Sequence, residues 1–280
     1  MKYLKIIGKS FIDFLKDDGI MLAGSSSYFF MMALVPFCLF LITIFGYTLG
    51  HYQEFYEFFS SRLISFFPDI TANITKELKK LNTFRGIGSL SLVLYGIVSF
   101  QVFFSVENSL NVIFKVKKKR HFFWSVVVSL IIMTILIFML IVSFIATSLI
   151  PLLKALKEVF PELRIGLITG FLIRYVVPFI MVLFTITVSY IFFPKIRIKI
   201  SHAFFGALFA TIFLEVAKHI FTWYIGTFVK FGTIYGPLTA FVVFLLWIFY
   251  SFCIFLVGAE VVHNQANYNK KRIRQKETQG

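Results

Sequence analysis

Cysteine, histidine and acidic residues are scarce in this chain of 280 residues, and each shortage excludes a class of function. The two cysteines, Cys38 and Cys253, lie inside apolar stretches, so we expect neither a disulfide framework nor a cysteine metal site. The five histidines are scattered, and the sequence has no His-x-x-x-His pair, Cys-x-x-Cys pair, Gly-rich phosphate loop or Gly-x-Ser-x-Gly turn. Metal-dependent hydrolysis needs clustered metal ligands, and serine hydrolases of this kind present their nucleophile on a Gly-x-Ser-x-Gly turn. We therefore expect no enzyme activity, no cofactor and no metal.

Hydrophobic residues are in excess: they make up 59% of the chain, in long blocks, and the mean hydropathy is +0.86. A soluble domain is about half apolar, and about 20 consecutive apolar residues cross a bilayer. We therefore predict an all-α polytopic membrane protein with six transmembrane helices. The predicted spans are residues 24–46, 86–113, 122–150, 165–193, 201–228 and 236–260. They form one transmembrane domain, residues 1–263, followed by a basic, frayed tail, residues 264–280.

Two segments outside the spans also carry helical patterns. Apolar side chains recur at helical spacing among lysines in residues 1–18, which predicts an amphipathic helix lying on the membrane surface. Residues 47–85 are rich in Phe and predict short helices at the outer interface, with an ordinary loop as the alternative.

The net charge of +15 comes from 28 Lys and Arg against 13 Asp and Glu. Basic residues flank the apolar spans, so we interpret them as anchors to anionic lipid and expect no nucleic-acid partner. Most lie in the amino end, the 114–121 and 194–200 connections and the tail. The positive-inside rule then places both termini in the cytoplasm. Expected partners are membrane lipids, with a homo-oligomer as a further candidate.

Polar residues inside the spans are the candidate binding site. On the fifth span they follow one stripe at helical spacing, and on the second they share a face: Thr211, Glu215, Lys218 and Thr222, then Gln101 and Asn108. Charges at this depth are costly unless paired. The stripe is therefore either a binding or gating site for lipid head groups or small ions, or a structural ion pair. Glu260, at the end of the last span, is interpreted as a lock to a basic loop.

Several short motifs recur in a fixed order along the spans. The first span holds a small-residue run, a tyrosine and a proline, and the second ends in a Leu-Asn pair: Gly24-Ser25-Ser26-Ser27, Tyr28, Pro36 and Leu110-Asn111. Later come a Pro-basic turn, a Gly-Ala pair and a closing pattern: Pro194-Lys195-Ile196-Arg197, Gly206-Ala207, Tyr235-Gly236, Trp247 and Gly258-Ala259-Glu260. With these motifs the chain resembles the YihY/BrkB family of bacterial inner-membrane proteins, formerly labelled ribonuclease BN. The resemblance implies a helical inner-membrane protein and no established reaction.

The leading functional hypothesis is a transporter or lipid-translocation protein with a polar intramembrane cavity. The alternative is a non-enzymatic envelope scaffold that binds lipid or partner proteins. Ribonuclease activity is not expected, because the chain offers no clustered metal ligands.

Overall fold

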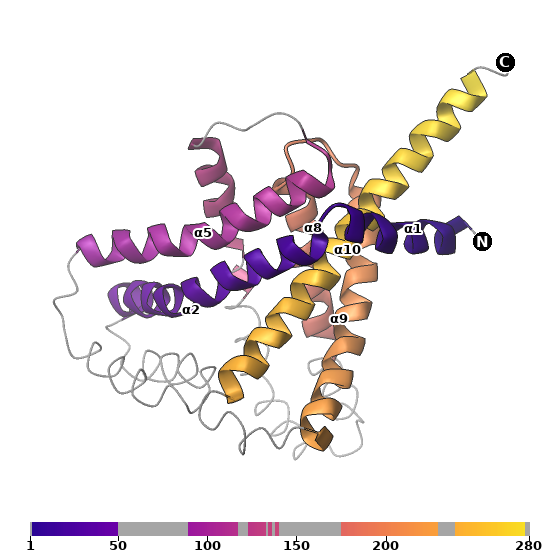
Figure 1. Ribbon diagram of the computed structural model, residues 1–280. Helices are drawn as coiled ribbons and strands as arrows, with labels where there is room; N and C mark the ends of the chain where they lie inside the picture. Colours follow the sequence, from indigo (N-terminus) through magenta and orange to yellow (C-terminus); the bar gives the residue numbers. More distant parts are fainter. Residues whose placement is uncertain are drawn as a thin grey trace, which may run out of the picture. The chain divides into compact units, whose positions relative to one another are not determined.

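The computed structural model describes residues 2–49, 89–116, 123–132, 134–135, 138–139, 175–228 and 239–277. Within these ranges all regular structure is helical, as the sequence predicts (Figure 1). The helices are α1 (Lys2–Lys16), α2 (Gly19–Leu49), α5 (Ser89–Ile113), α8 (Val177–Phe192), α9 (Ile200–Phe228) and α10 (Thr239–Glu277), with a further apolar helix at Phe123–Ile132. The helices predicted within 47–85, and the motif residues Tyr235 and Gly236, lie outside the described residues.

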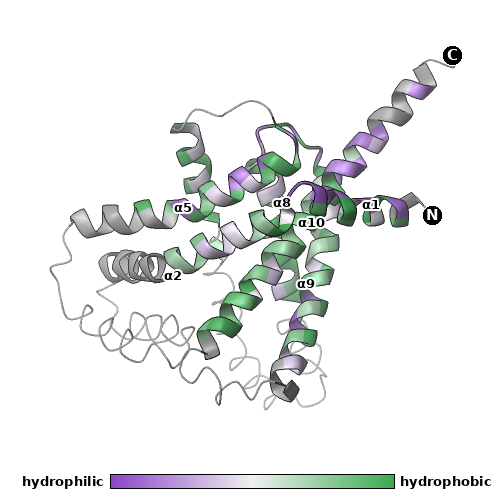
Figure 2. Ribbon diagram, in the orientation of Figure 1, coloured by the Kyte–Doolittle hydropathy of each residue, from purple (hydrophilic) through white to green (hydrophobic). Residues whose placement is uncertain are grey.

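In the part of the chain that the structure describes, two helical stretches are long and apolar enough to cross a membrane, Ile200–Tyr224 in α9 and Phe241–Asn269 in α10 (Figure 2). Three shorter apolar stretches accompany them: Gly19–Leu34, Phe123–Ile132 and Val177–Phe192. Among the described residues, five of the six predicted spans thus overlap one of these apolar stretches, two of membrane length and three shorter, whereas α5, in the predicted span 86–113, is in neither group. Much of the predicted spans 122–150 and 165–193 lies outside those residues.

The helix bounds differ from the predicted spans mainly at the two ends of the chain. α2 begins at Gly19 instead of residue 24, and it continues as one helix through Pro36 to Leu49. α10 continues past residue 260 to Glu277, so the tail predicted to be frayed is helical there. The physical reason is tertiary: Asn264 and Asn269 contact other helices, and those contacts hold the extension in place.

The chain divides into two compact units that interleave in sequence. The first unit comprises residues 1–19, 110–219 and 254–280, and the second comprises residues 20–109 and 220–253. The unit boundaries therefore cut α5, α9 and α10. Each of these helices contributes one end to each unit.

In the first unit, α9 meets α10 at two glycines. A Cβ atom on Gly206 would overlap the side chain of Val262 and lie 2.7 Å from the carbonyl oxygen of Gly258. A Cβ atom on Gly258 would overlap the Tyr190 hydroxyl and lie 2.8 Å from the Cβ atom of Ala210. That hydroxyl donates a 2.5 Å hydrogen bond to the Phe255 carbonyl. The absence of two side chains lets the helix backbones approach closely, as small residues do in membrane bundles.

In the second unit, buried serines join α2 to α5. The Ser26 hydroxyl lies 3.3 Å from the Ser105 hydroxyl and 3.2 Å from the Ser109 hydroxyl, and all three residues are buried. Ser27 donates to the Ala23 carbonyl of its own helix at 2.6 Å. The small-residue run at the start of the first predicted span therefore provides both close packing and interhelical hydrogen bonds.

Candidate functional site

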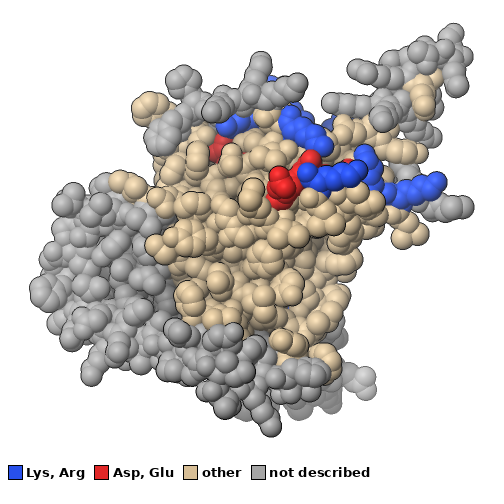
Figure 3. Space-filling view, in the orientation of Figure 1, with Lys and Arg blue, Asp and Glu red and all other residues tan. Residues whose placement is uncertain are grey.

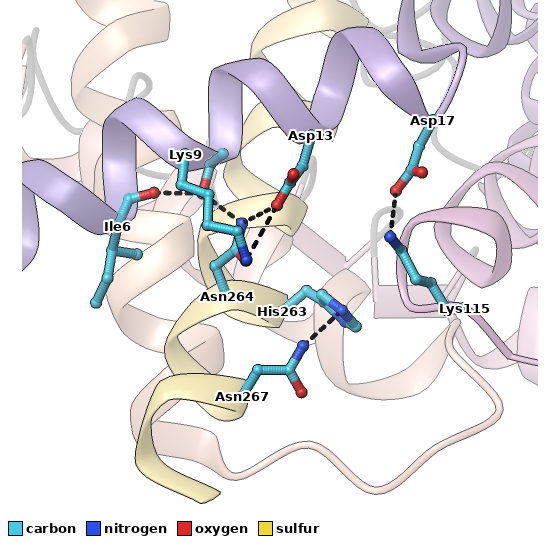
Figure 4. A network of polar contacts seen from close by, with 9 residues as sticks. Ile6, Lys9, Asp13, Asp17, Lys115, His263, Asn264 and Asn267 are labelled. Atoms are coloured by element: carbon cyan, nitrogen blue, oxygen red, sulfur yellow. Dashed lines mark hydrogen bonds and ion pairs between the residues drawn. The ribbon is translucent and has the colours of Figure 1, made fainter. Parts of the chain in front are cut away.

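The first unit contains a cluster of polar side chains from three elements (Figure 4). We call this set the α1–α10 cluster: Lys9, Ser10, Asp13 and Asp17 on α1, Lys115 in the turn after α5, and Glu260, His263, Asn264 and Asn267 on α10. Figure 3 shows charged side chains of both signs gathered over α1, beside a broad uncharged surface. The cluster is where the structure concentrates ionisable groups from distant parts of the sequence.

Asn264 is the centre of the contacts between α1 and α10. Its amide nitrogen donates to the Ser10 hydroxyl at 3.1 Å and to the Asp13 carboxylate at 3.0 Å. Its amide oxygen accepts from the Lys9 ammonium at 2.9 Å. The amide orientation follows from its partners, because an ammonium group can only donate and a carboxylate can only accept. Asn264 and Ser10 are buried, so the bond between them is sheltered from water, whereas the bonds to Lys9 and Asp13 are only partly buried.

Asp13 gains more from its partners than it loses by burial. Partial burial opposes ionisation, but the hydrogen bond from Asn264 and the charge of Lys9, 3.5 Å away, hold the pKa of Asp13 below its usual value. Asp13 is therefore ionised in the folded protein across the physiological range. This carboxylate attaches α1 to α10.

Lys115 connects the end of α5 to the cluster. α5 ends in a Schellman motif: Val116 N–H donates to the Asn111 carbonyl and Lys115 N–H to the Val112 carbonyl, both at 2.9 Å. Lys115 occupies the left-handed position with φ 54°, which usually favours glycine. Its ammonium pairs with the Asp17 carboxylate at 3.1 Å. The contact with Asp17 raises the pKa of Lys115 above its usual value, although partial burial acts in the opposite direction.

Glu260 is the most enclosed acid of the cluster. It is 0% exposed, and among the described residues no donor reaches either carboxylate oxygen. Its carboxyl instead lies close enough to the carboxyl of Asp17 for the two groups to interact. One turn along α10, His263 Nε2 lies 2.8 Å from the Asn267 amide nitrogen, and the His263 ring packs edge-on against Phe114. With the amide as donor, the His263 ring is neutral.

The predicted stripe on α9 consists of one ion pair and two threonines in different surroundings. Lys218 donates to Glu215 within the helix, and His219 Nε2 lies 3.6 Å from the same carboxylate. The side chains of Glu215 and Lys218 are 40% and 51% exposed. Thr211 is buried and donates to the Ala207 carbonyl at 2.8 Å, whereas Thr222 is exposed. The stripe therefore passes from the buried side of α9 to its open side.

The polar face predicted on the second span is also divided. Gln101 and Asn108 are exposed, whereas Ser105 is buried in the serine contacts described above. Gln101 and Asn108 belong to the second unit, whereas Glu215 and Lys218 belong to the first.

Several motif residues converge in the first unit. The Asn111 side chain accepts a 3.0 Å hydrogen bond from the backbone of Lys195, beside the buried Pro194. Gly206 and Gly258 form the close contact of α9 with α10, and Glu260 follows two residues after Gly258. In the second unit, Trp247 packs on Phe221 with ring centroids 5.1 Å apart, and Tyr28 is exposed. Most of the motif residues that the structure describes are thus packing or capping residues.

Sequence reasoning missed Asn264 and the meeting of Asp17 with Glu260. Asn264 lay in the predicted polar tail, where an asparagine carries no signal of its own. The one available signal was helical spacing, since Glu260, His263, Asn264 and Asn267 share a face of α10 if the helix continues past residue 260. Among the described residues, no group of three His, Cys, Asp or Glu is placed to hold a metal ion.

Comparison with known proteins places the chain in a family. The profile of the virulence factor BrkB family matches residues 10–280. A UPF0761 membrane protein of Chlorobium limicola is 28% identical over 273 residues, 95% of this chain and 59% of the relative. One from Glaesserella parasuis is 30% identical over 176 residues, 63% of this chain and 61% of the relative. One from Haemophilus influenzae is 27% identical over 241 residues, 85% of this chain and 87% of the relative.

The chain spans about three fifths of the length of the first two of these relatives. No solved structure matches it. The profile match covers nearly the whole chain, and the relatives are named as membrane proteins of bacteria. The resemblance seen in the motifs is therefore confirmed: the chain is a membrane protein that belongs to the virulence factor BrkB family.

Proposed function

We propose that the protein crosses the inner membrane six times and moves a small ion or a lipid head group along the polar side of α9. The observation that carries this proposal is the Glu215–Lys218 pair, which lies half-exposed midway along an apolar helix. At 1.5 Å per residue, α9 is roughly 43 Å long and Glu215 lies roughly 22 Å from its start, near its midpoint. A helix of this length centred in a hydrocarbon core of about 30 Å places Glu215 near the middle of that core.

Charged groups at that depth favour water or protein on the open side of α9 over lipid. Each charge costs about 2.5–3.5 kcal/mol at the centre of a bilayer even on insertion scales. Pairing within the helix reduces this cost, but it leaves both side chains about half-exposed. Exposed large apolar residues flank the pair, including Val216 and Ile220, so it is a polar site on an otherwise apolar surface. A water-filled passage, or a second copy of the chain, satisfies both facts.

The first unit supports the proposed topology, with both termini in the cytoplasm. It brings together the four basic segments that the positive-inside rule assigns to that side. Lys9 contacts Asn264, Lys115 contacts Asp17, Lys195 contacts Asn111, and His202, at the start of α9, contacts Asn269 near the tail. Segments in contact at helix ends lie on one side of a bilayer.

We also propose that the protein is not an enzyme and binds no nucleic acid or cofactor. The three histidines that the structure describes each have a partner of structural character. His202 bonds Asn269, His263 bonds Asn267 and His219 lies beside Glu215. A structural role for all three is sufficient to account for their surroundings.

The transport proposal is tested with two double variants in proteoliposomes. Glu215→Gln with Lys218→Met removes both charges, which buried pairs often tolerate structurally. Glu215→Lys with Lys218→Glu keeps an ion pair and reverses its direction. Two fluxes are measured, scrambling of a head-group-labelled phosphatidylglycerol and ion flux reported by an entrapped dye. We expect activity in the parent protein and its loss in both folded variants.

The reversed pair separates the two functional hypotheses. A purely structural pair works in either direction, so full activity in the reversed variant would assign Glu215 and Lys218 to the architecture. Absence of both fluxes in the parent protein would favour the scaffold hypothesis, in which the chain binds lipid or partner proteins.

A further inference from the structure

If every acid and base of the α1–α10 cluster carried its ordinary charge, the positive and negative charges would not balance. The carboxyl groups of Asp13, Asp17 and Glu260 face two ammonium groups, those of Lys9 and Lys115. With His263 neutral, full ionisation leaves one negative charge in excess in a region that contains a fully buried carboxyl. Uncompensated buried charge is strongly unfavourable. One bound proton or one bound monovalent cation would cancel it.

The contact geometry identifies where that positive charge resides. Asp13 is fully engaged, because Asn264 donates to it and Lys9 lies 3.5 Å away. Asp17 has Lys115 at 3.1 Å. Glu260 has no hydrogen-bond donor among the described residues, and its carboxyl lies beside that of Asp17. Two carboxylates repel at this range, whereas a carboxylic acid donates to a carboxylate in one of the stronger hydrogen bonds known in proteins.

We propose that Glu260 and Asp17 form a proton-binding site, in which Glu260 carries one proton and donates it in a hydrogen bond to the Asp17 carboxylate. Binding takes up one proton from solution and forms one O–H bond on Glu260, and release restores two carboxylates. Lys115 holds the Asp17 side of the pair from the turn after α5. The bound proton thus links α1, α10 and that turn.

A proton fits this site better than a metal cation. Hard cations take six or more oxygen ligands when they bind to proteins. The described residues contain no group of three His, Cys, Asp or Glu placed to hold a metal ion. Lys115 already stands beside Asp17, where a metal cation would meet its repulsion. A proton needs only the two carboxyl oxygens that the structure provides.

The proposal is tested by infrared spectroscopy on the purified full chain in lipid nanodiscs. A protonated carboxyl shows a carbonyl stretch that ionised carboxylates lack. We expect this band at neutral pH in the parent protein and its loss in Glu260→Gln, which keeps the shape and the ability to donate to Asp17. The matched controls are Glu107→Gln, at a buried acid of the second unit, and Glu215→Gln on α9. Both controls retain the Glu260 band.

Charge balance gives a second, directional test. Asp17→Asn leaves two carboxyls facing two lysines, so Glu260 ionises and the neutral-pH band is lost. Lys115→Met leaves one lysine, so the band persists to higher pH than in the parent protein. Circular dichroism confirms that each variant remains folded.

Three results would overturn the proposal. The first is a parent protein without the band at neutral pH, and the second is a band that survives Glu260→Gln. The third is loss of the band on adding sodium or potassium chloride at constant pH, which would assign the site to a metal cation. None of these measurements uses the transport assay, so the outcome is independent of the proposed function.

Discussion

Gly206 and Gly258 show how one missing side chain sets the distance between two helices. A Cβ atom at Gly206 would meet the backbone oxygen of Gly258, which cannot move aside as the end of a flexible side chain can. Packing extra atoms into such a site costs about 1–3 kcal/mol. Gly8 on α1 is the opposite case, since a Cβ atom there meets nothing within 4 Å.

We therefore expect Gly206→Ala to destabilise the first unit by about 1–3 kcal/mol. Gly8→Ala is the matched control. It leaves stability unchanged or raises it by about 0.5–1 kcal/mol, because alanine favours a helix over glycine. Thermal unfolding of the two variants in the same detergent, followed by circular dichroism, compares them directly. Equal midpoints for the two variants would show that α9 and α10 do not meet at Gly206 as described.

At the scale of elements, α1 combines three different faces. Ile6, Ser10 and Phe14 are buried, whereas Leu4, Phe11 and Leu15 are exposed although apolar. Lysines occupy the remaining side: Lys5, Lys9 and Lys16. A helix with one face on protein, one apolar face open and one basic face suits a position at a bilayer surface. The periodicity of the sequence could predict the helix and its amphipathic character, but only the structure identifies which face α10 covers.

The attachment of α1 to α10 depends on the ionised Asp13. Its pKa is lowered in the folded state, so its contribution is present above the unfolded value of about 3.9 and is lost as the pH falls through the folded value. Lys115 has a raised pKa, so its contribution is present below about 10.4 and is lost only at higher pH. The contacts of α1 are thus weakened by acid long before they are weakened by base.

We expect a nitroxide spin label at Leu4 on α1 to become more mobile as the pH falls below about 4. A label at Phe204 on α9 is the control, because that exposed position does not depend on Asp13. Labels are attached at neutral pH and read by electron paramagnetic resonance across the range. The variant Asp13→Asn removes the titrating group, so its α1 label shows a mobility that no longer changes in this range. Equal changes at both positions would indicate general unfolding.

The element bounds show where sequence reasoning was sufficient. The expected span 201–228 matches α9 (Ile200–Phe228) closely, because an uninterrupted apolar run and a preceding Pro-basic turn define it. α10 extends beyond the predicted span 236–260, since hydropathy ends near Glu260 while the helix continues to Glu277. The continuation rests on tertiary hydrogen bonds of Asn264 and Asn269, which no local pattern contains.

At the scale of the whole molecule, the candidate site could be found only in part. Glu260 and the Glu215–Lys218 pair were visible from the sequence, because ionisable residues in apolar runs are conspicuous. Their partners were not. Asp17 lies near the amino end, Lys115 follows the second predicted span, and Glu260 closes the last, so only the fold brings the three together. The long-range charge balance of the cluster has no signature in composition or periodicity.

The proposed topology predicts which positions are reachable from outside the cell. In a variant with Cys38 and Cys253 replaced by alanine, single cysteines are introduced at Asn73, Lys118 and Gly8. A membrane-impermeant maleimide applied to intact spheroplasts labels the cysteine at Asn73, because the connection between the first two spans carries fewer basic residues for its length. It does not label Lys118 or Gly8, because both lie in basic segments assigned to the cytoplasm.

Permeabilised cells are the control, since all three positions react once the membrane is open. Labelling of Lys118 in intact spheroplasts, with protection of Asn73, would reverse the orientation. It would also place the α1–α10 cluster and its bound proton on the outer side of the membrane, where the external pH would set its occupancy.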